Sequence, residues 1–351
     1  MTTKKEDIMG LIGARTEDAT CLTFTYGSES KLSGEGVSTS VSLPGGFNLT
    51  VDEPEAFPGG SNAGPNPLDL MCASLGTCQE ITYKLYATVL DIPVKSVSAK
   101  VSGDINLSGF VGVGEKIGFS GVNVEITLDA PDASDEQLEA LKGAVDAHCP
   151  LVSSLQNPLD LTTSVVKAEP NKSSDRTQNN LVEGVMGLIG AAKEDGDALK
   201  MTYGSTSVLS GDGLLTTASL TGGHTIVVDE PETMPGGTNK GTNPLDLFCA
   251  SFGTCQEITY KYYGQVMGID VQSVSCKVEA PIDLGGLVGL ADDAVGLKSM
   301  KGTVTVESSA SQEQLEELKT ACDGHCPLVD TYKSATPVTL TWKRASSGGK
   351  K

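Results

Sequence analysis

Four cysteines carry the clearest chemical signal in this sequence of 351 residues, namely Cys78, Cys149, Cys255 and Cys326. Cys149 directly precedes Pro150, which suits the first position of a helix, so Cys149 is expected at a helix N-terminus. Free backbone N–H groups and the helix dipole favour a thiolate there. Cys78 lies in a helical pattern of small and apolar residues, which fits a buried structural thiol and a reactive one equally well. Two such thiols about 70 residues apart suit a peroxidatic and resolving pair if the fold brings them together.

The other five cysteines are interpreted as structural. Cys72 and Cys249 lie six residues before Cys78 and Cys255, about 120° around a helix at roughly 3.6 residues per turn, where core packing is expected. The remaining three have no cysteine at the matching position of the other half of the chain: Cys21, Cys276 and Cys322.

Several other chemistries have little support in the sequence. Three histidines and no C-x-x-C pair leave His148 and Cys149 without a local metal-binding partner, so no metal is expected. The chain has no P-loop, no G-x-G-x-x-G after a strand and no G-x-S-x-G elbow, so no nucleotide or other cofactor is expected. Glu80 and Lys84 are interpreted as an exposed i,i+4 ion pair, repeated at Glu257 and Lys261.

Composition limits the partners and the compartment. A net charge of -20 disfavours nucleic acid and anionic membranes as partners. No run approaches the roughly 18 apolar residues of a membrane span, and the first residues lack the apolar core of a secretory signal. An odd number of cysteines fits free thiols in a reducing compartment, so a cytoplasmic location is expected.

The two halves of the chain repeat one another at an offset of 177 residues. Met9–Gly13 recurs at Met186–Gly190, and 17 of the 19 positions between Asn66 and Lys84 match their counterparts from Asn243 onward. This period is much longer than a solenoid unit, so each copy is expected to bury its own core. The predicted division is a first domain over 1–168, a polar linker over 169–180, a second domain over 181–345 and a tail over 346–351.

Each repeat is predicted to have an α+β fold. Alternating apolar and polar residues from Cys21 to Val51 predict an antiparallel meander, and the loop from Asp52 to Pro65, rich in Pro and Gly, is typical of segments that border sites. Asn66 and Pro67 predict a helix start, with the helix running to about Val89. Two more strands, a helix opened by a capping box at Ser134–Gln137, a short turn after Pro150 and a final strand complete the repeat.

A set of motifs resembles the OsmC/Ohr family. They are Gly64 to Leu70, then Ala73 to Cys78, then His148 to Val152, and the second half carries all three. The resemblance implies two OsmC-like domains, each with antiparallel sheets around a long core helix, arranged as a dimer fused into one chain. It also implies a peroxidase in which Cys78 and Cys255 attack an organic hydroperoxide. Cys149 and Cys326 would then form disulfides with them, and a dithiol reductant of the lipoyl type would restore the thiols.

Two family features are missing from the sequence. Peroxidase members of the family place an arginine near the end of the meander and a glutamate just after the N-P pair. Here the three arginines are Arg15, Arg176 and Arg344, and Leu68 stands at the glutamate position. The alternative is therefore a non-peroxidase member of the same fold that binds a small apolar or thiol ligand where the two domains meet. A purely structural role for the cysteines is a third alternative.

Overall fold

The structure is a computed structural model that describes residues 2–170, 181–289 and 295–346. Its helices are α1 (Lys5–Glu17), α2 (Pro67–Val89), α3 (Asp135–His148), α4 (Pro150–Gln156), α5 (Leu181–Glu194), α6 (Pro244–Met267), α7 (Gln312–His325) and α8 (Pro327–Lys333), with short 3-10 turns η1 (Pro44–Gly46), η2 (Thr221–Gly223) and η3 (Gly286–Val288). The strands of the first repeat are β1 (Thr23–Ser33), β2 (Thr39–Leu43), β3 (Phe47–Val51), β4 (Ser96–Asn106), β5 (Gly121–Asp129) and β6 (Asp160–Ala168). Those of the second are β7 (Lys200–Ser210), β8 (Thr216–Leu220), β9 (Thr225–Val228), β10 (Ser273–Asp283), β11 (Ser299–Glu307) and β12 (Val338–Arg344).

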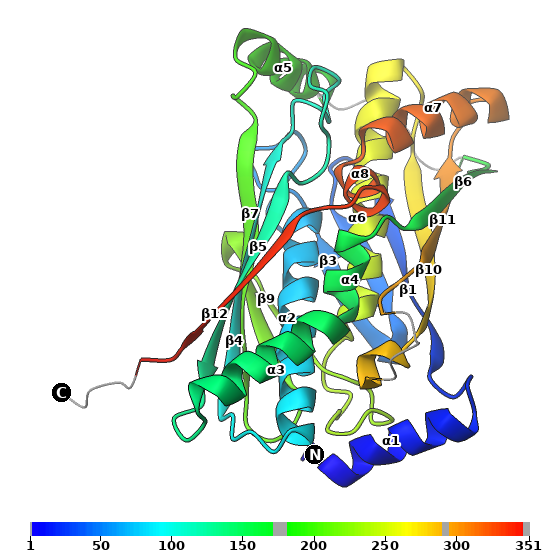
Figure 1. The fold of residues 1–351 in the computed structure, drawn as a ribbon. Helices are drawn as coiled ribbons and strands as arrows, with labels where there is room; N and C mark the ends of the chain where they lie inside the picture. The colour runs from blue at the N-terminus through cyan, green and yellow to red at the C-terminus, as the bar shows by residue number, and fades with distance from the viewer. Residues whose placement is uncertain (1, 171–180, 290–294, 347–351) are drawn as a thin grey trace.

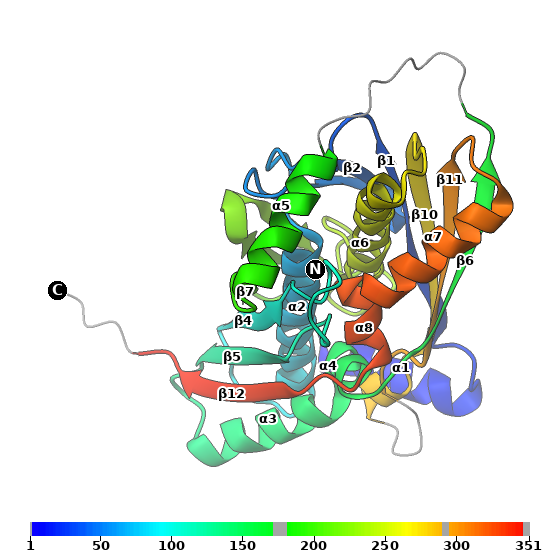
Figure 2. The same cartoon turned by 90° about the horizontal axis from the view of Figure 1, so that it is seen from above.

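The two long helices, α2 and α6, lie between two six-stranded sheets (Figure 1). One sheet has the order β3-β2-β1-β10-β11-β6, and the other has the order β12-β5-β4-β7-β8-β9. Helix α2 packs against the second sheet and α6 against the first, while α2 and α6 contact each other in the centre (Figure 2). This arrangement confirms the predicted α+β class and the fused pseudo-dimer.

Each sheet is built from both sequence repeats. Strand β1 pairs with β10 antiparallel over its whole length, and β4 pairs with β7 in the same way. The final strands of the repeats, β6 and β12, run parallel to β11 and β5 at the sheet edges, so the sheets are not wholly antiparallel. One continuous buried apolar cluster therefore draws on both repeats, and the expectation that each copy buries its own core is wrong.

Most elements predicted within a repeat are confirmed. The meander forms β1, β2 and β3 as an antiparallel ladder, and the first long helix spans Pro67–Val89 as expected. The Asn66 side chain accepts a hydrogen bond from Leu68 N–H, and the capping box at Ser134 and Gln137 is present. Helices α1 and α5 are not among the predicted elements, because their glycines weaken a helical pattern.

The predicted division at 1–168 and 181–345 concerns the sequence repeats, and it stays a prediction. Nearly all of the predicted linker over 169–180 and of the tail over 346–351 lies outside the described residues. The three-dimensional units do not follow that division, because each sheet exchanges strands between the repeats.

Glu80 is not part of an exposed ion pair, so that interpretation was wrong. Its carboxylate is fully buried and accepts hydrogen bonds from Ala99 N–H at 2.9 Å, from the Ser207 hydroxyl at 2.8 Å and from the Thr216 hydroxyl. Lys84 instead donates to the Gly211 carbonyl oxygen. The strand exchange explains the difference, since it places strands of the second repeat over a helix face that one repeat alone would leave in water.

Glu257 is buried in the same way in the second repeat. It accepts hydrogen bonds from the Ser30 hydroxyl and from Cys276 N–H, while Lys261 donates to the Val271 carbonyl oxygen. The ion-pair interpretation is therefore wrong in both repeats.

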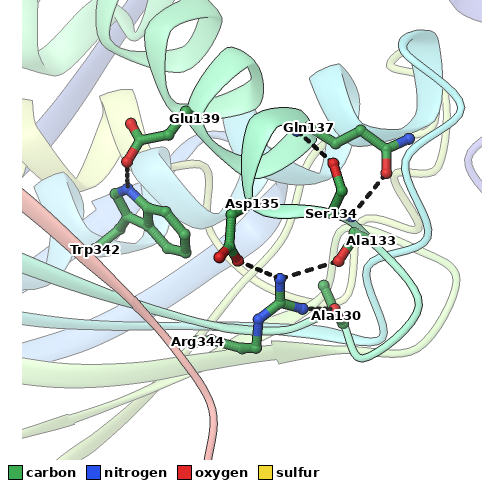
Figure 3. A network of polar contacts seen from close by, with 8 residues as sticks. All are labelled: Ala130, Ala133, Ser134, Asp135, Gln137, Glu139, Trp342 and Arg344. Atoms are coloured by element: carbon green, nitrogen blue, oxygen red, sulfur yellow. Dashed lines mark hydrogen bonds and ion pairs between the residues drawn. The ribbon is translucent and has the colours of Figure 1, made fainter.

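Strand β12 of the second repeat is fastened to helix α3 of the first (Figure 3). The Arg344 guanidinium donates to the carbonyl oxygens of Ala130 and Ala133 and to the Asp135 carboxylate. The Trp342 indole N–H donates to Glu139 at 3.1 Å. These contacts tie the end of the second repeat to the first turns of a helix in the first repeat.

Candidate active site

The fold brings together both cysteine pairs that the sequence singled out. Cys78 lies in the middle of α2 and Cys149 is the N-cap of α4, and their Sγ atoms are 3.5 Å apart. Cys255 in α6 and Cys326 before α8 repeat the arrangement at 3.3 Å. All four are free thiols, because an S–S bond measures about 2.05 Å. The separations are short enough for either pair to form a disulfide after small side-chain rotations.

The N-terminus of α4 favours a thiolate on Cys149. Burial of Cys149 favours the neutral thiol, but hydrogen bonds from the Cys78 thiol, Val152 N–H, Gln79 and Leu151 N–H outweigh burial and lower its pKa. A helix N-terminus presents such unsatisfied N–H groups, and its dipole acts in the same direction. The predicted thiolate position is therefore supported by the geometry.

The matching thiol at the other site, Cys326, behaves in the same way. Burial opposes its ionisation, and the contacts with the Cys255 thiol and the Gln256 side chain, together with hydrogen bonds from Val329 N–H and Leu328 N–H, lower its pKa. Both sites therefore hold one acidic thiol at a helix start.

Cys78 is the weaker acid of its pair. Its hydrogen bond with Cys149 is the largest cause that raises its pKa, and burial adds to the effect. The pKa of Cys255 is raised in the same way, first by Cys326 and then by burial. In each pair the thiol at the following helix start is therefore the stronger acid, and the thiol on the long helix is the weaker one.

A buried glutamine accompanies each pair. Gln79 and Gln256 follow Cys78 and Cys255 directly in sequence and are fully buried. Among the described residues, neither amide has a hydrogen-bond partner of normal geometry, and each one lies close enough to Cys149 or Cys326 to lower the pKa of that thiol. A buried amide donor beside a thiolate stabilises the charge without carrying one itself.

Cys78 faces a small pocket that both repeats build. Ile81 and Pro150 of the first repeat line it together with Met234 and Leu287 of the second, and its volume is about 20 Å³. Cys149 lies behind Cys78 and is 1% exposed, compared with 6% for Cys78. The thiol that meets a molecule in this pocket is therefore Cys78.

Cys255 faces the corresponding pocket, of about 30 Å³, on the other side of the molecule. Phe57 and Leu68 of the first repeat line it together with Ile258 and Tyr262 of the second. Each pocket therefore lies at a boundary between the repeats, and neither repeat alone contains a complete site.

A buried carboxylic acid of the opposite repeat lines each pocket. Glu230 lies in the Cys78 pocket, where burial first, and then the charges of Asp229 and Asp246, raise its pKa to about 8. Glu53 lies in the Cys255 pocket, and burial likewise raises its pKa to about 8. Both acids are thus mainly protonated at neutral pH, and each one can donate a proton to a bound molecule.

Tyrosines and carboxylic acids occupy the pockets where the family resemblance implied an arginine. Tyr26 lines the Cys78 pocket and Tyr203 the Cys255 pocket. Of the described arginines, Arg15 pairs with Asp283 and Arg344 with Asp135, and neither lines a pocket. Cys78 and Cys255 therefore have no guanidinium beside them within the part of the chain that the structure describes.

The cysteines interpreted as structural belong to neither close thiol pair, although Cys276 and Cys322 lie near Cys326. Four of them are buried, in accordance with core packing: Cys72, Cys249, Cys276 and Cys322. Cys21 is half-buried and lines a different cavity. In the ranges that the structure covers, no group of three or more His, Cys, Asp or Glu side chains is arranged to hold a metal ion.

Sequence reasoning missed the tyrosines and the glutamines of the site; it placed Asp52 and Glu53 where the family arginine would lie, but it did not assign them to the site of the opposite repeat. A signal was present, because Glu53, Tyr26 and Gln79 each recur 177 residues later at Glu230, Tyr203 and Gln256. The offset could not show that Glu53 and Tyr203 line the pocket of Cys255 while Glu230 and Tyr26 line that of Cys78. Each thiol meets the acid and the tyrosine of the opposite repeat only because the repeats exchange strands.

The fold and the paired thiols define a class of tandem α+β proteins with two thiol sites between intertwined repeats. The sequence profile of the OsmC-like protein family matches residues 59–164 and 237–341, and the chain belongs to this family. Each of the two matches contains both cysteines of a predicted pair.

Two solved structures are similar to parts of the chain. An OsmC-like protein from Mycoplasma pneumoniae shares 19% identity, with a TM-score of 0.33 over 40% of this chain and 96% of that one. An OsmC-like protein of unknown function from Vibrio cholerae shares 15% identity, with a TM-score of 0.29 over 37% of this chain and 84% of that one. No curated protein sequence matches the chain. None of the helices in the described ranges has the length and apolar character needed to cross a bilayer.

Proposed function

We propose that the protein is a thiol peroxidase that reduces organic hydroperoxides by a two-cysteine mechanism at two sites. The observation that carries the proposal is the approach of Cys78 Sγ to Cys149 Sγ at 3.5 Å, repeated by Cys255 and Cys326 at 3.3 Å. A single buried thiol needs no such partner, whereas a peroxidatic and resolving pair must come this close.

The first step oxidises the thiol that faces the pocket. The Cys78 sulfur attacks the distal oxygen of the hydroperoxide, and Cys78 gives its proton to the Cys149 thiolate as it does so. The Cys149 thiolate is therefore the base of this step, at a site that has no arginine to stabilise a Cys78 thiolate. The S–O bond forms, the O–O bond breaks, and the alkoxide leaves. Protonated Glu230 supplies the proton that turns the alkoxide into an alcohol, and Cys78 becomes a sulfenic acid.

The second step forms the disulfide. Cys149 returns its proton to the Glu230 carboxylate through the pocket, and its thiolate attacks the Cys78 sulfenic sulfur. The leaving hydroxide is released as water after it takes a proton from solvent. The two electrons that reduced the O–O bond therefore come from the thiol pair, which is left as a disulfide.

A small dithiol restores the pair. Its thiolate attacks the more exposed sulfur, that of Cys78, and its second thiol completes the exchange and leaves as a cyclic disulfide. The buried position of both sulfurs favours a slender reductant, such as a lipoyl-type dithiol, over a folded protein partner. The site thus needs no metal and no bound cofactor for this cycle.

A second candidate is a ligand-binding protein without peroxidase activity. It is favoured by the lack of a described arginine beside Cys78 or Cys255 and by the raised pKa of both thiols. Under this candidate the pockets would hold a small apolar or thiol ligand, and the cysteines would stay reduced in the presence of hydroperoxide.

Mass spectrometry of the reduced protein distinguishes the two candidates. After about one equivalent of cumene hydroperoxide per site, the peroxidase loses two hydrogens per site within seconds, and the disulfides map to Cys78–Cys149 and Cys255–Cys326. Cys149→Ser removes both the base and the resolving sulfur, so Cys78 is expected to oxidise more slowly and to stop at the sulfenic acid, which dimedone traps. Cys72→Ser removes a buried thiol outside the pairs and is the matched control. Oxidation no faster than that of free cysteine would reject the peroxidase and favour the ligand-binding protein.

A further inference from the structure

A second cavity opens beside the Cys78 pocket. Its volume is about 480 Å³, within the range of about 300–1,000 Å³ that is usual for small-molecule sites. Leu11 of α1 and Phe24 of β1 line it, together with Phe47 of β3 and residues of the loop that precedes α6. It therefore lies, like the thiol pocket, between the two repeats.

The cavity adjoins the thiol pocket. Tyr26, Glu230 and Met234 line both spaces. The pocket at Cys78, about 20 Å³ in volume, has room for little more than a peroxide group. The rest of any larger molecule that reacts with Cys78 must then lie in the cavity.

The walls of the cavity are apolar and acidic, with Thr25, Thr233, Asn239 and Asn243 as neutral polar residues among them. Phe24, Tyr26 and Phe47 give it an aromatic surface, and the acidic groups are Asp229 and Asp246 beside Glu230. No Lys or Arg is among the described residues that line it. An anionic group would therefore enter an apolar space beside carboxyl groups, with no cation to compensate its charge.

The acidic groups are already engaged by the protein. Asp229 accepts hydrogen bonds from Glu230 N–H, Thr238 and Lys240 N–H, and Asp246 accepts one from Gly27 N–H at 2.9 Å. They are therefore fixed parts of the wall, and they do not turn away to make room for a second negative charge.

We propose that this cavity binds an uncharged, elongated apolar molecule whose reactive end reaches Cys78, and that it rejects molecules that carry a carboxylate. The assignment of a reactive end rests on the proposed function, whereas the cavity and its preference for an uncharged ligand do not. The larger substrate of the protein is accordingly an uncharged hydroperoxide, such as an ester or a hydrocarbon derivative.

The second site provides a built-in comparison. Phe57 of the Cys255 pocket corresponds to Met234 of the Cys78 pocket, 177 residues later in the sequence. Phe110 of the Cys255 pocket corresponds to Leu287 of the Cys78 pocket in the same way. The Phe110 and Tyr262 rings contact each other edge-on at 5.8 Å. Met234→Phe thus introduces at one site a residue that the fold already accepts at the other.

Calorimetric titration of the reduced protein with 1-decanol and with decanoate, both below their aggregation limits, tests the proposal. These probes share one chain and differ in head group, and neither contains a peroxide. We expect decanol to bind about tenfold or more tighter than decanoate at pH 7. Asp246→Asn removes one acidic group and keeps an acceptor for Gly27 N–H. The variant should therefore bind decanoate better, and the difference between the affinities for decanol and decanoate should become smaller.

Variants locate the binding. Met234→Phe should weaken decanol binding about fivefold or more, while the mirror variant Phe57→Met should leave it unchanged. If Met234→Phe does not fold, Thr25→Trp at the exposed rim of the cavity blocks the same space without changing the core.

Equal affinities for the two probes, or unchanged decanol binding in both blocking variants, would overturn the proposal. Decanol binding without oxidation of Cys78 by cumene hydroperoxide would remove the proposed function and leave the cavity assignment intact. Oxidation of Cys78 without decanol binding would leave the proposed function intact and overturn the cavity assignment.

Discussion

Glu80 of the first repeat accepts a hydrogen bond from the Ser207 hydroxyl of the second at 2.8 Å, and both side chains are shielded from water. Glu257 and Ser30 make the same contact from the second repeat to the first, also at 2.8 Å. Buried carboxyl groups are stable only when hydrogen bonds satisfy them, so each repeat supplies partners that the other requires.

The two halves are therefore expected to fold only together. Residues 1–170 and 181–351, when produced separately, should show no cooperative thermal transition, because each would expose a long strand edge and a buried glutamate. Produced together, they should form a 1:1 complex with a single transition, measured by circular dichroism and gel filtration. A cooperative, monomeric transition for either half alone would contradict the shared core.

Removal of the Arg344 contacts should destabilise the protein without affecting the thiols. Arg344→Met leaves the carbonyl oxygens of Ala130 and Ala133 without their donor and is expected to cost about 1–3 kcal/mol in the free energy of unfolding. Lys343→Met is the matched control, since Lys343 pairs with exposed Glu125 and should change stability by less than about 0.5–1 kcal/mol. Urea unfolding measures both. Equal losses of unfolding free energy in the two variants would show that the contacts of Arg344 near α3 do not stabilise the protein.

Stability should decrease as the pH rises from about 4.5 to 8. Burial raises the pKa of Glu53, Glu80 and Glu230 to about 8 and that of Asp246 to about 7, so the folded protein keeps protons that the unfolded chain releases near pH 4 to 4.5. A state that binds more protons is favoured at lower pH, and this advantage is lost as the pH passes the folded pKa values.

The melting temperature between pH 5 and 8.5 at constant ionic strength measures the effect. Glu80→Gln, which keeps an acceptor for Ala99 N–H, should flatten the dependence. A melting temperature that rises through this range would contradict the raised pKa values.

Gln79 should lower the pKa of Cys149 through its amide. Gln79→Leu removes that donor and is expected to raise the Cys149 pKa, whereas Gln79→Glu should raise it further by bringing in a carboxylate. The pH dependence of iodoacetamide alkylation, resolved by peptide mass spectrometry, measures this pKa. Cys326 in the same sample is the internal control, because its own partner Gln256 is untouched. Parallel shifts at Cys149 and Cys326 would indicate a global change instead.

Glu230 should act as the proton donor at the Cys78 site and not at the Cys255 site. Cys78 oxidation by cumene hydroperoxide is expected to slow above about pH 8 as Glu230 loses its proton, and Glu230→Gln should lower the rate about 10²-fold and abolish that decline. Glu53→Gln is the mirrored control and should slow Cys255 alone. The same loss of rate at both sites in either single variant would contradict this assignment.

Local features were predictable from the sequence because they depend on neighbours in the chain. Asn66 and Pro67 set a helix start, and Cys149 before Pro150 sets a second one, so the thiolate position could be inferred. The approach of Cys78 to Cys149 came only from the family resemblance, since it depends on how α2 packs against α4.

The burial of Glu80 and the position of Glu230 could not be predicted. Both depend on contacts between repeats, and the i,i+4 spacing of Glu80 and Lys84 is equally typical of an exposed helix face. The repeated acid at Glu53 and Glu230 was visible in the sequence, but its partner thiol lies in the opposite repeat.

The crossing of the pockets has a consequence for how such a protein changes over time. In a dimer of identical chains, one substitution alters both sites at once. In this chain, a substitution of Met234 alters only the site of Cys78, and a substitution of Phe57 alters only that of Cys255. Fusion of the two copies thus lets the two sites acquire separate specificities. Each half of the gene encodes pocket residues that surround the thiol encoded by the other half.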